Sequence, residues 1–360
     1  MKKILFPLGY SVYPFVVGGM EIFNYYFVKS LSSDYKTYYL SAKPLDFNDA
    51  LHLRIFSLRP SKIFYPLQLF CHLLFKRKID TIVYSYSDAH WIIWYLFDKI
   101  ASLLKIPYIV VIHFGKQPPS DHYSIYKNFF SNAKKVIAVS SDIKKNFDSR
   151  YAINSEVIYP LVPFHKASSS KSDLRMKYGV PQDANVICMV GTIKKMKNPD
   201  TIIDALAKLN HEDLLKYKPF IVFAGVGDMS DEIKAKVSAC NLSDYVKFLG
   251  FIPKENVNEV MALSDIYLIA SDFEGTSVSL LEAMYNGKAI LASNVPGIRD
   301  TISKDECVMF PVRDSEKLSE VLVKLLNDGN LRERISILAR KRFIADYSYE
   351  RMINQYRKYL

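Results

Sequence analysis

The first half of the chain alternates short apolar runs with longer amphipathic stretches. The apolar runs are rich in valine, isoleucine and aromatic residues, and they occupy residues 3–8, 37–42, 81–86, 108–114 and 135–140. Patterns with helical spacing separate them, and the clearest lie at residues 21–33 and 91–105. Apolar strands that alternate with helices predict a parallel sheet covered by helices on both faces.

A second series of the same kind follows. Its expected strands occupy 186–191, 220–225, 246–250, 266–271 and 289–294, with helical patterns at 198–209 and 231–240. The polar, Ser/Lys-rich stretch 165–179 is predicted to be a linker, and the charged tail from about residue 315 is predicted to be helical. These patterns predict two Rossmann-like domains, at 1–164 and 165–344, and we expect a C-terminal helix at about 345–360 to return to the first.

The composition fits a globular chain in a reducing compartment. Of the 360 residues, 49% are hydrophobic and 24% are charged, so sizeable cores can form. The cysteines lie far apart and form no C-x-x-C pair, which argues against zinc and against a disulfide framework. The first residues could pass for a signal peptide, but prolines interrupt the apolar run and no A-x-A site follows. We therefore interpret them as a first strand and expect a cytoplasmic protein.

Positive charge is concentrated in the first half of the chain. The net charge is +11, and residues 1–165 carry 20 lysine and arginine residues against 11 acidic ones. Such an excess fits nucleic acid, an anionic membrane or an anionic substrate, and also a basic surface without a specific partner. Residues 52–78 are interpreted either as a membrane-surface element or as a core helix with solvated cations at its ends. This stretch mixes aromatic residues with Arg54, Arg59, Lys62, Lys76, Arg77 and Lys78.

The clearest chemical signal is the stretch DFEGTSVSLLEAMYNGKAI at residues 272–290. It follows an expected strand, and a helix is predicted to begin near Thr276 or Ser277 and to end near Asn286. The first turn of such a helix offers free amides and the positive end of a dipole. Gly275 lets an anionic group approach the backbone closely, so the stretch predicts an anion site.

Two carboxylates, Glu274 and Glu282, lie on either side of this predicted anion site. Glu282 is expected roughly 6–9 Å from the helix N-terminus, which is a plausible reach from a diphosphate to a ribose. Carboxylates suit vicinal diols because each carboxylate accepts two hydrogen bonds. The pattern fits a nucleotide-sugar, whereas the alternative is an ordinary helix cap and one surface glutamate.

The same stretch resembles the Glu-x7-Glu motif of the family-4 retaining glycosyltransferases. Further stretches resemble this family in order, namely MVGTIKKMKNPDTIIDAL, FIVFAGVGD, VKFLGFIPKENVNEVMALSDIYLIASDFEG and ILASNVPGIRDTI. The resemblance implies an α/β chain with the GT-B fold, in which two Rossmann-like domains face each other across a cleft. It implies a glycosyltransferase whose donor is a nucleotide-sugar, taken as a UDP-sugar on family frequency. It implies no metal and no cofactor besides this co-substrate.

The resemblance also implies roles for the matching residues of the second domain. Glu274 would hold hydroxyls of the donor sugar, and Glu282 would hold the ribose diol. The backbone amides of Thr276, Ser277 and Val278 would face the diphosphate.

Further roles fall on two loops and on a histidine. Lys197 matches a lysine that pairs with the diphosphate, and Gly191 opens its loop. Gly18 and Gly19 resemble a Gly-Gly loop whose amides approach the phosphate, and His113 matches a histidine that faces the donor sugar. Without the family, these residues fit a solvated charge run, a plain turn and a loop histidine with a local hydrogen bond.

Three stretches depart from the family pattern, namely Thr192, residues 160–163 (Pro-Leu-Val-Pro) in place of the usual Asn-Gly, and residues 287–290 (Gly-Lys-Ala-Ile) in place of the common Gly-x-Pro-Val. Thr192 stands where an arginine usually follows Gly191. One phosphate-binding charge is therefore either missing or supplied by Lys194 or Lys195. None of these departures touches the two glutamates, and they concern the donor and the subfamily more than the activity.

The resemblance further implies an acceptor bound by the basic first domain. Many relatives build surface polysaccharides, such as capsule or O-antigen, on polyprenyl-diphosphate lipids. We expect a glycan or a polyprenyl-diphosphate-linked acceptor, with peripheral attachment to the inner face of the cell membrane. No nucleic-acid partner is expected, because charge alone suggests one and no nucleic-acid motif is present.

Other classes of protein fit the sequence less well. A dinucleotide-dependent oxidoreductase is disfavoured, because Gly225-Val-Gly227 is followed by Ser230 where a third glycine is needed. A nucleotide-sugar epimerase of GT-B shape would not share the Glu-x7-Glu pattern. A catalytically inactive partner subunit is disfavoured because both glutamates and Lys197 are present.

Overall fold

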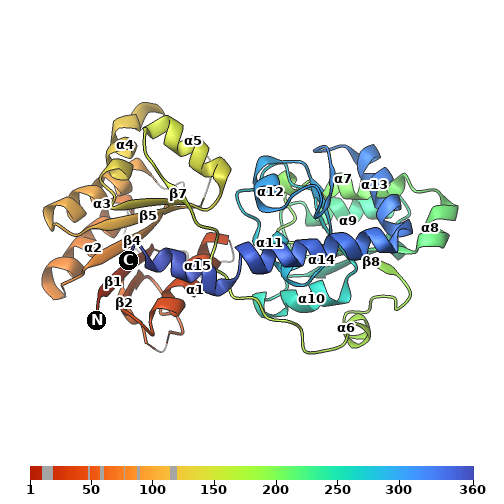
Figure 1. Cartoon of the computed structure of the whole chain (residues 1–360), viewed down its shortest axis with the longest axis horizontal. Helices are drawn as coiled ribbons and strands as arrows, with labels where there is room; N and C mark the ends of the chain where they lie inside the picture. Colours follow the sequence, from red (N-terminus) through yellow and green to blue (C-terminus); the bar gives the residue numbers. More distant parts are fainter. Residues whose placement is uncertain (10–18, 48, 57–60, 77, 87–89, 114–119) are drawn as a thin grey trace. The chain divides into compact units, whose positions relative to one another are not determined.

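The structure is a computed structural model of the chain, and it describes all residues except 10–18, 48, 57–60, 77, 87–89 and 114–119 (Figure 1). Its internal contacts divide the chain into two compact units. Unit 1 comprises Met1–Pro163 and Tyr349–Leu360, and unit 2 comprises Phe164–Ser348. The chain therefore passes between the units twice, once at each end of unit 2.

Unit 1 is built on a parallel sheet. In its described part, seven strands lie in the order β3-β2-β1-β4-β5-β6-β7. The five strands predicted for the first half are confirmed, whereas the edge strands β3 and β7 were missed because they have only four and two residues. The bounds are β1 Lys3–Gly9, β2 Lys36–Ser41, β3 Leu51–Arg54, β4 Thr81–Tyr86, β5 Tyr108–Ile112, β6 Lys135–Ala138 and β7 Glu156–Val157.

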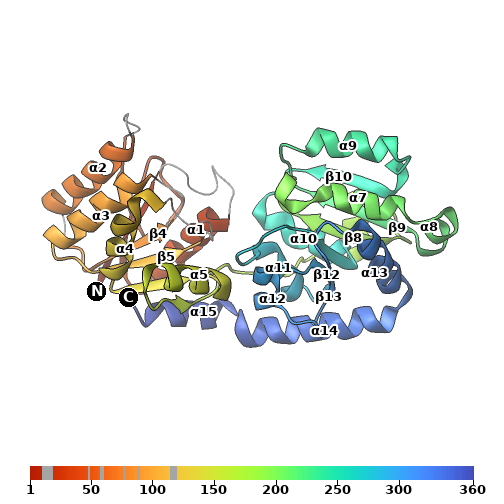
Figure 2. The same cartoon turned by 90° about the horizontal axis from the view of Figure 1, so that it is seen from above.

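The helices of unit 1 enclose a core rich in aromatic residues. Helices α2, α3 and α4 pack as successive neighbours (Figure 2). Helix α15 packs on α1, because the ring of Tyr356 lies 5.6 Å from that of Phe23 and 4.6 Å from that of Phe27. The bounds are α1 Gly19–Leu31, α2 Ser61–Lys76, α3 Trp91–Leu103, α4 Tyr123–Ser131, α5 Ser141–Tyr151 and α15 Tyr349–Arg357.

Unit 2, all of whose residues are described, contains a second parallel sheet. Its six strands lie in the order β10-β9-β8-β11-β12-β13, and the short β13 is the one strand that was not predicted. The strand order reverses between the neighbours β8 and β11, and in such sheets ligands bind beyond the carboxyl ends at this point. The bounds are β8 Asn185–Val190, β9 Pro219–Ala224, β10 Val246–Gly250, β11 Ile266–Ile269, β12 Ala289–Ser293 and β13 Val308–Phe310.

Two groups of helices pack on this second sheet. Helix α7 contacts α9 and α13, whereas α10 contacts α6 and α11, and α11 contacts α14. The predicted helical tail is confirmed as α13, α14 and α15. The bounds are α6 Lys171–Lys177, α7 Pro199–Ala207, α8 His211–Tyr217, α9 Ser230–Ala239, α10 Val257–Leu263, α11 Val278–Tyr285, α12 Pro296–Thr301, α13 Ser315–Asn327 and α14 Gly329–Asp346.

The predicted linker at 165–179 is wrong in part, because this stretch contains α6. Ser170 caps the helix, and its Oγ accepts a hydrogen bond from the Asp173 amide at 3.2 Å. Leu174 and Arg175 are buried, and α6 packs on α10. The Ser/Lys-rich composition is typical of a linker, but the burial of Leu174 and Arg175 is enough to hold a short helix against α10.

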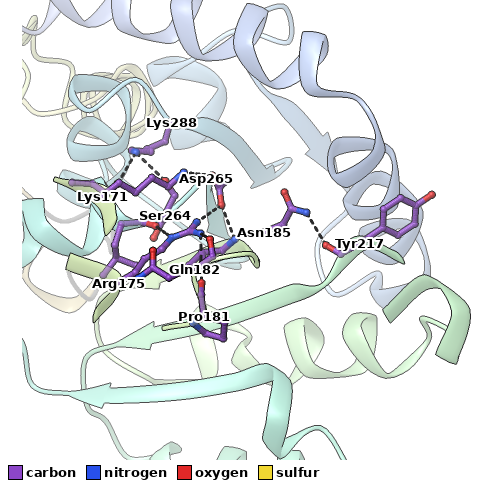
Figure 3. A network of polar contacts seen from close by, with 12 residues as sticks. Lys171, Arg175, Pro181, Gln182, Asn185, Tyr217, Ser264, Asp265 and Lys288 are labelled. Atoms are coloured by element: carbon purple, nitrogen blue, oxygen red, sulfur yellow. Dashed lines mark hydrogen bonds and ion pairs between the residues drawn. The ribbon is translucent and has the colours of Figure 1, made fainter. Parts of the chain in front are cut away.

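Arg175 is the centre of a polar network next to the start of β11 (Figure 3). Its Nε donates to the Leu263 carbonyl at 3.1 Å, and its Nη1 donates to the Gln182 carbonyl at 2.6 Å. Its Nη2 pairs with Asp265 Oδ2 at 2.8 Å, and Lys171 pairs with the other oxygen of this carboxylate. The guanidinium thereby joins α6 to the end of α10 and to the sheet.

Candidate active site

Two loops meet beyond the carboxyl ends of β8 and β11. The loop after β8 begins at Gly191 and contains the short 3-10 helix Lys195–Lys197, and the loop after β11 carries Glu274. The Lys197 ammonium pairs with Glu274 Oε1, and Ser271 Oγ donates to the same oxygen at 2.6 Å. Glu274 is only 8% exposed. Lys197 is therefore not part of a solvated charge run, because it is committed to a buried carboxylate.

Residues that were not predicted from the sequence hold the Lys197 loop in place. Asn198 Nδ2 donates to the Ala270 carbonyl at 2.9 Å and to the Asp272 carboxylate. Arg313 Nε donates to the same carboxylate at 3.0 Å. These contacts join the loops after β8 and β11, and they fix the direction from which Lys197 meets Glu274.

The start of α12 packs against the loop that carries Glu274. A Cβ atom at Gly297 would lie 1.9 Å from the Glu274 carbonyl oxygen and 2.4 Å from that of Gly275. Only glycine fits at such distances, so Gly297 permits the close approach of α12 to this loop. Gly297 lies in the family-like stretch ILASNVPGIRDTI, and no role for it was predicted from the sequence.

The helix behind Glu274 has the predicted bounds. It is α11, Val278–Tyr285, and Ser277 is its N-cap, since Ser277 Oγ accepts a hydrogen bond from the Leu280 amide at 3.3 Å. Asn286 is its C-cap, as predicted. The helix therefore starts directly after the Glu274 loop, and the role of the amides of residues 276–278 toward a diphosphate stays a prediction.

Glu282 lies in the middle of α11 and is 3% exposed. Its Oε1 pairs with the ammonium of Lys254, which begins the 3-10 helix Lys254–Asn256 after β10. Burial raises the pKa of Glu282, and Lys254 opposes this rise. Lys254 was not among the predicted site residues, because no local pattern shows that it meets a residue 28 positions further along.

The remaining predicted site residues belong to unit 1. Gly19 begins α1, and Gly18 lies outside the described residues. His113 directly follows β5, and its ring centroid lies 4.6 Å from that of Phe23. Its Nε2 is shielded from solvent and has no hydrogen-bond partner among the described residues. Burial lowers the pKa of His113 to about 3, so its imidazole is neutral near neutral pH.

The low pKa of His113 predicts a specific pH dependence of stability. In the unfolded chain a histidine takes up a proton near pH 6.5, whereas in the folded chain it does so only near about pH 3. The unfolded state therefore binds more protons between these values, and the free energy of unfolding falls as the pH falls through this range. We expect His113→Gln to reduce this dependence by up to about 1.4 kcal/mol per pH unit.

Urea unfolding, monitored by tryptophan fluorescence, measures the free energy of unfolding of unit 1, because Trp91 and Trp94 both lie in this unit with His113. His165→Gln, at an exposed histidine of unit 2, is the control and should keep the wild-type pH dependence. An unchanged dependence in His113→Gln would contradict the prediction.

A family model describes most of unit 2. Residues 170–342 match the family described as Glycosyl transferases group 1. The chain therefore carries a domain of this family, and its second Rossmann-like unit is the one that holds Lys197, Glu274 and Glu282.

Curated relatives agree with this assignment. An uncharacterized glycosyltransferase of Methanocaldococcus jannaschii is 27% identical over 240 residues, which are 65% of this chain and 60% of that protein. N-acetyl-alpha-D-glucosaminyl L-malate synthase of Bacillus anthracis is 27% identical over 186 residues, which are 51% of this chain and 47% of that protein. The matched parts thus span 60% or less of the length of these two relatives.

A solved structure shows the likeness of the fold. The crystal structure of Anabaena Alr3699/HepE in complex with UDP-glucose has a TM-score of 0.79 at 17% identity. The match covers 99% of this chain and 98% of that chain. The predicted fold class, that of the GT-B glycosyltransferases with two Rossmann-like domains, is confirmed.

Proposed function

We propose that this chain is a retaining glycosyltransferase that moves a sugar from a nucleotide-sugar to an acceptor hydroxyl. The pairing of Lys197 with Glu274 directly before α11 carries the proposal. Glu282 lies further along the same helix. A cation, a helix N-terminus and two carboxylates would then face a molecule that contains a sugar, a diphosphate and a ribose.

In the proposed reaction, the acceptor oxygen bonds to the anomeric carbon while the bond from this carbon to the diphosphate oxygen breaks. The electron pair of the broken bond goes to the leaving diphosphate, which takes the proton of the acceptor. Lys197 and the first amides of α11 stabilise the growing negative charge. Glu274 positions the sugar. The reaction is proposed to need no metal ion.

We propose a UDP-sugar as the donor, supported by the UDP-glucose bound to the Anabaena protein of the same fold. Saturation-transfer NMR against UDP-, GDP- and dTDP-sugars tests this. We expect selective binding of UDP-sugars, weakened by at least about tenfold in Glu282→Ala, because a charge-assisted hydrogen bond contributes about 1.5–3 kcal/mol.

Glu259→Ala is the matched control, since Glu259 of α10 pairs with the exposed Lys177 instead. If the folded wild-type protein binds no nucleotide-sugar, the proposal is wrong, and the inactive-subunit alternative gains support. If the donor sugar changes configuration without an acceptor, the epimerase alternative is favoured.

We further propose that the acceptor is a glycan or a polyprenyl-diphosphate-linked glycan of a bacterial surface polysaccharide, used at the inner face of the cell membrane. Helix α2 supports this proposal. Tyr65, Leu69 and Leu73 on one face are buried, as the core-helix alternative expects. The opposite face exposes an apolar stripe, spaced at helical intervals, that the core-helix alternative does not explain. This stripe consists of Ile63, Leu67, Cys71 and Leu74.

Two exposed cations lie near α2. The carbonyl of Arg54 contacts His72 Nε2 of α2 at 3.1 Å, and Lys78 lies just after the helix, whereas Arg59 and Arg77 lie outside the described residues. An amphipathic helix with cations beside its apolar face is typical of binding in the plane of an anionic membrane surface. Among the described residues, no helix has the length and the apolar character that are needed to cross a bilayer.

Liposome flotation tests the membrane proposal. We expect the protein to float with vesicles that contain phosphatidylglycerol at low salt, and to float less at high salt, because salt screens the cations. Leu67→Asp should lose most of this binding. Ile337→Asp, at an isoleucine of α14 that is 59% exposed, is the matched control and should float like the wild type. Equal loss in both variants, or no flotation by the wild type, contradicts the proposal.

A further inference from the structure

The ion pair between Lys254 and Glu282 lies almost wholly out of solvent. The side chains are 8% and 3% exposed, respectively. Burying two charges costs desolvation energy that their attraction barely offsets, so a buried ion pair is weak evidence for a role in stability. The position of this pair, inside the helix that starts at the Glu274 loop, indicates a role in the site instead.

Aromatic side chains enclose the Lys254 ammonium on another side. Lys254 Nζ lies 5.7 Å from the centroid of the Phe164 ring, a distance at which a cation is attracted to the face of a ring. Phe164 stacks on Tyr285 with ring centroids 5.6 Å apart, and it meets Phe343 edge-on at 5.1 Å. Lys254 is therefore held between a carboxylate of α11 and a packed aromatic cluster.

The carboxylate of Glu282 depends on this one cation. Among the described residues, Lys254 is its only hydrogen-bond or ion-pair partner, and the contact uses Oε1. The second oxygen, Oε2, is left for a ligand. An ionised carboxylate only accepts hydrogen bonds, whereas a protonated one donates from one oxygen. Lys254 favours the ionised form, which can accept hydrogen bonds from both hydroxyls of a vicinal diol.

We propose that Lys254 is a positioning residue for nucleoside recognition, because it fixes the Glu282 carboxylate in the orientation that receives the ribose diol. This inference rests on the proposed function, in which Glu282 binds the ribose. Lys254 does not need to touch the nucleotide, since it acts through Glu282. Its effect should therefore be confined to ligands that carry both ribose hydroxyls.

A comparison of UDP with its 2′-deoxy analogue separates this role from a merely structural one. We expect the wild-type protein to prefer UDP by about tenfold or more, as a hydrogen bond from a hydroxyl to a charged group implies. In Lys254→Met this preference should fall to about twofold or less, because Glu282 loses its ionised, fixed state. Binding is measured by calorimetry, and thermal melting of each variant confirms that it is folded.

Three further variants sharpen the test. Glu282→Gln should lose the preference alone, and adding Lys254→Met to it should have little further effect on the preference, because both act on one contact. Lys254→Gln, which keeps a polar group of similar length, replaces Lys254→Met if the latter does not fold. Lys247→Met removes a lysine of β10 that bonds to Gly179, and it should keep the wild-type preference.

The outcomes distinguish this inference from the proposed function. If the wild type prefers UDP and Lys254→Met keeps the preference, or loses affinity for both ligands equally, the role of Lys254 is refuted and the proposed function stands. If the wild type binds neither nucleotide, both are refuted. If it binds the two equally well, Glu282 does not receive the diol and the inference is refuted.

Discussion

Replacing Lys197 with alanine is expected to lower kcat by about 100- to 1000-fold, the usual cost of removing one preorganised donor from a developing negative charge. In the proposed reaction, charge grows on the leaving diphosphate, and Lys197 is the cation that the loop after β8 presents to it. The contact with Glu274 holds the ammonium in place before the donor binds. The variant should also bind the donor more weakly, because the ground state already carries phosphate charge.

The assay measures the release of nucleoside diphosphate from the sugar donor that the NMR panel selects. Lys208→Ala is the matched control, since Lys208 is an exposed lysine of the same unit that pairs with the exposed Glu316. It should keep wild-type activity. A folded Lys197→Ala variant that keeps more than about a tenth of wild-type kcat would show that other groups carry the leaving-group charge.

Arg175→Met is expected to lower the free energy of unfolding of unit 2 by about 3–5 kcal/mol. The guanidinium is 5% exposed and makes hydrogen bonds to the Leu263 and Gln182 carbonyls and to Asp265. Methionine can fill part of the space, but it leaves the buried Leu263 carbonyl without this donor and takes one of two cations from Asp265. The cost falls on unit 2, because every residue of this network lies there.

Urea unfolding measures this loss with two signals. Far-UV circular dichroism reports both units, whereas tryptophan fluorescence reports unit 1, because Trp91 and Trp94 both lie there. We expect the variant to shift the dichroism transition and to leave the fluorescence transition near the wild-type midpoint. Lys171→Met is the matched control at the same carboxylate. Its side chain is 47% exposed, and such a surface pair contributes about 1 kcal/mol or less. Equal losses in both variants would contradict the prediction.

The strands that the sequence predicts are the interior strands of both sheets and the five-residue edge strand β10. Strands β3, β7 and β13 were missed, because they are two to four residues long and lie at sheet edges. Their pairing comes from the neighbouring strand rather than from their own composition. Helix α6 was missed for a related reason, since its stability comes from two buried residues and a serine cap rather than from a periodic apolar face.

The candidate site was predictable only where one loop and its helix carry the pattern. Glu274, Ser277 and Glu282 lie within nine residues, and the resulting helix has the expected cap. Lys197, the partner of Glu274, was predicted only through the family resemblance, and the other contacts were not predicted, because they come from distant parts of the chain. Arg313 reaches Asp272 from 41 residues away, and Lys254 reaches Glu282 from 28 residues away. A short stretch of sequence shows which side chains a loop contains. It does not show which side chains from distant parts of the chain contact them in the folded protein.

The division of unit 1 between two parts of the chain has a consequence for synthesis on the ribosome. Unit 2 is continuous, so it can close its core as soon as residues 164–348 have left the exit tunnel. Unit 1 needs Met352, Ile353 and Tyr356 of α15 in its core, and these residues are made after the whole of unit 2. The N-terminal part therefore leaves an apolar surface beside α1 uncovered until residues 349–360 have been made, although it is made first. The order of folding is thus the reverse of the order of synthesis.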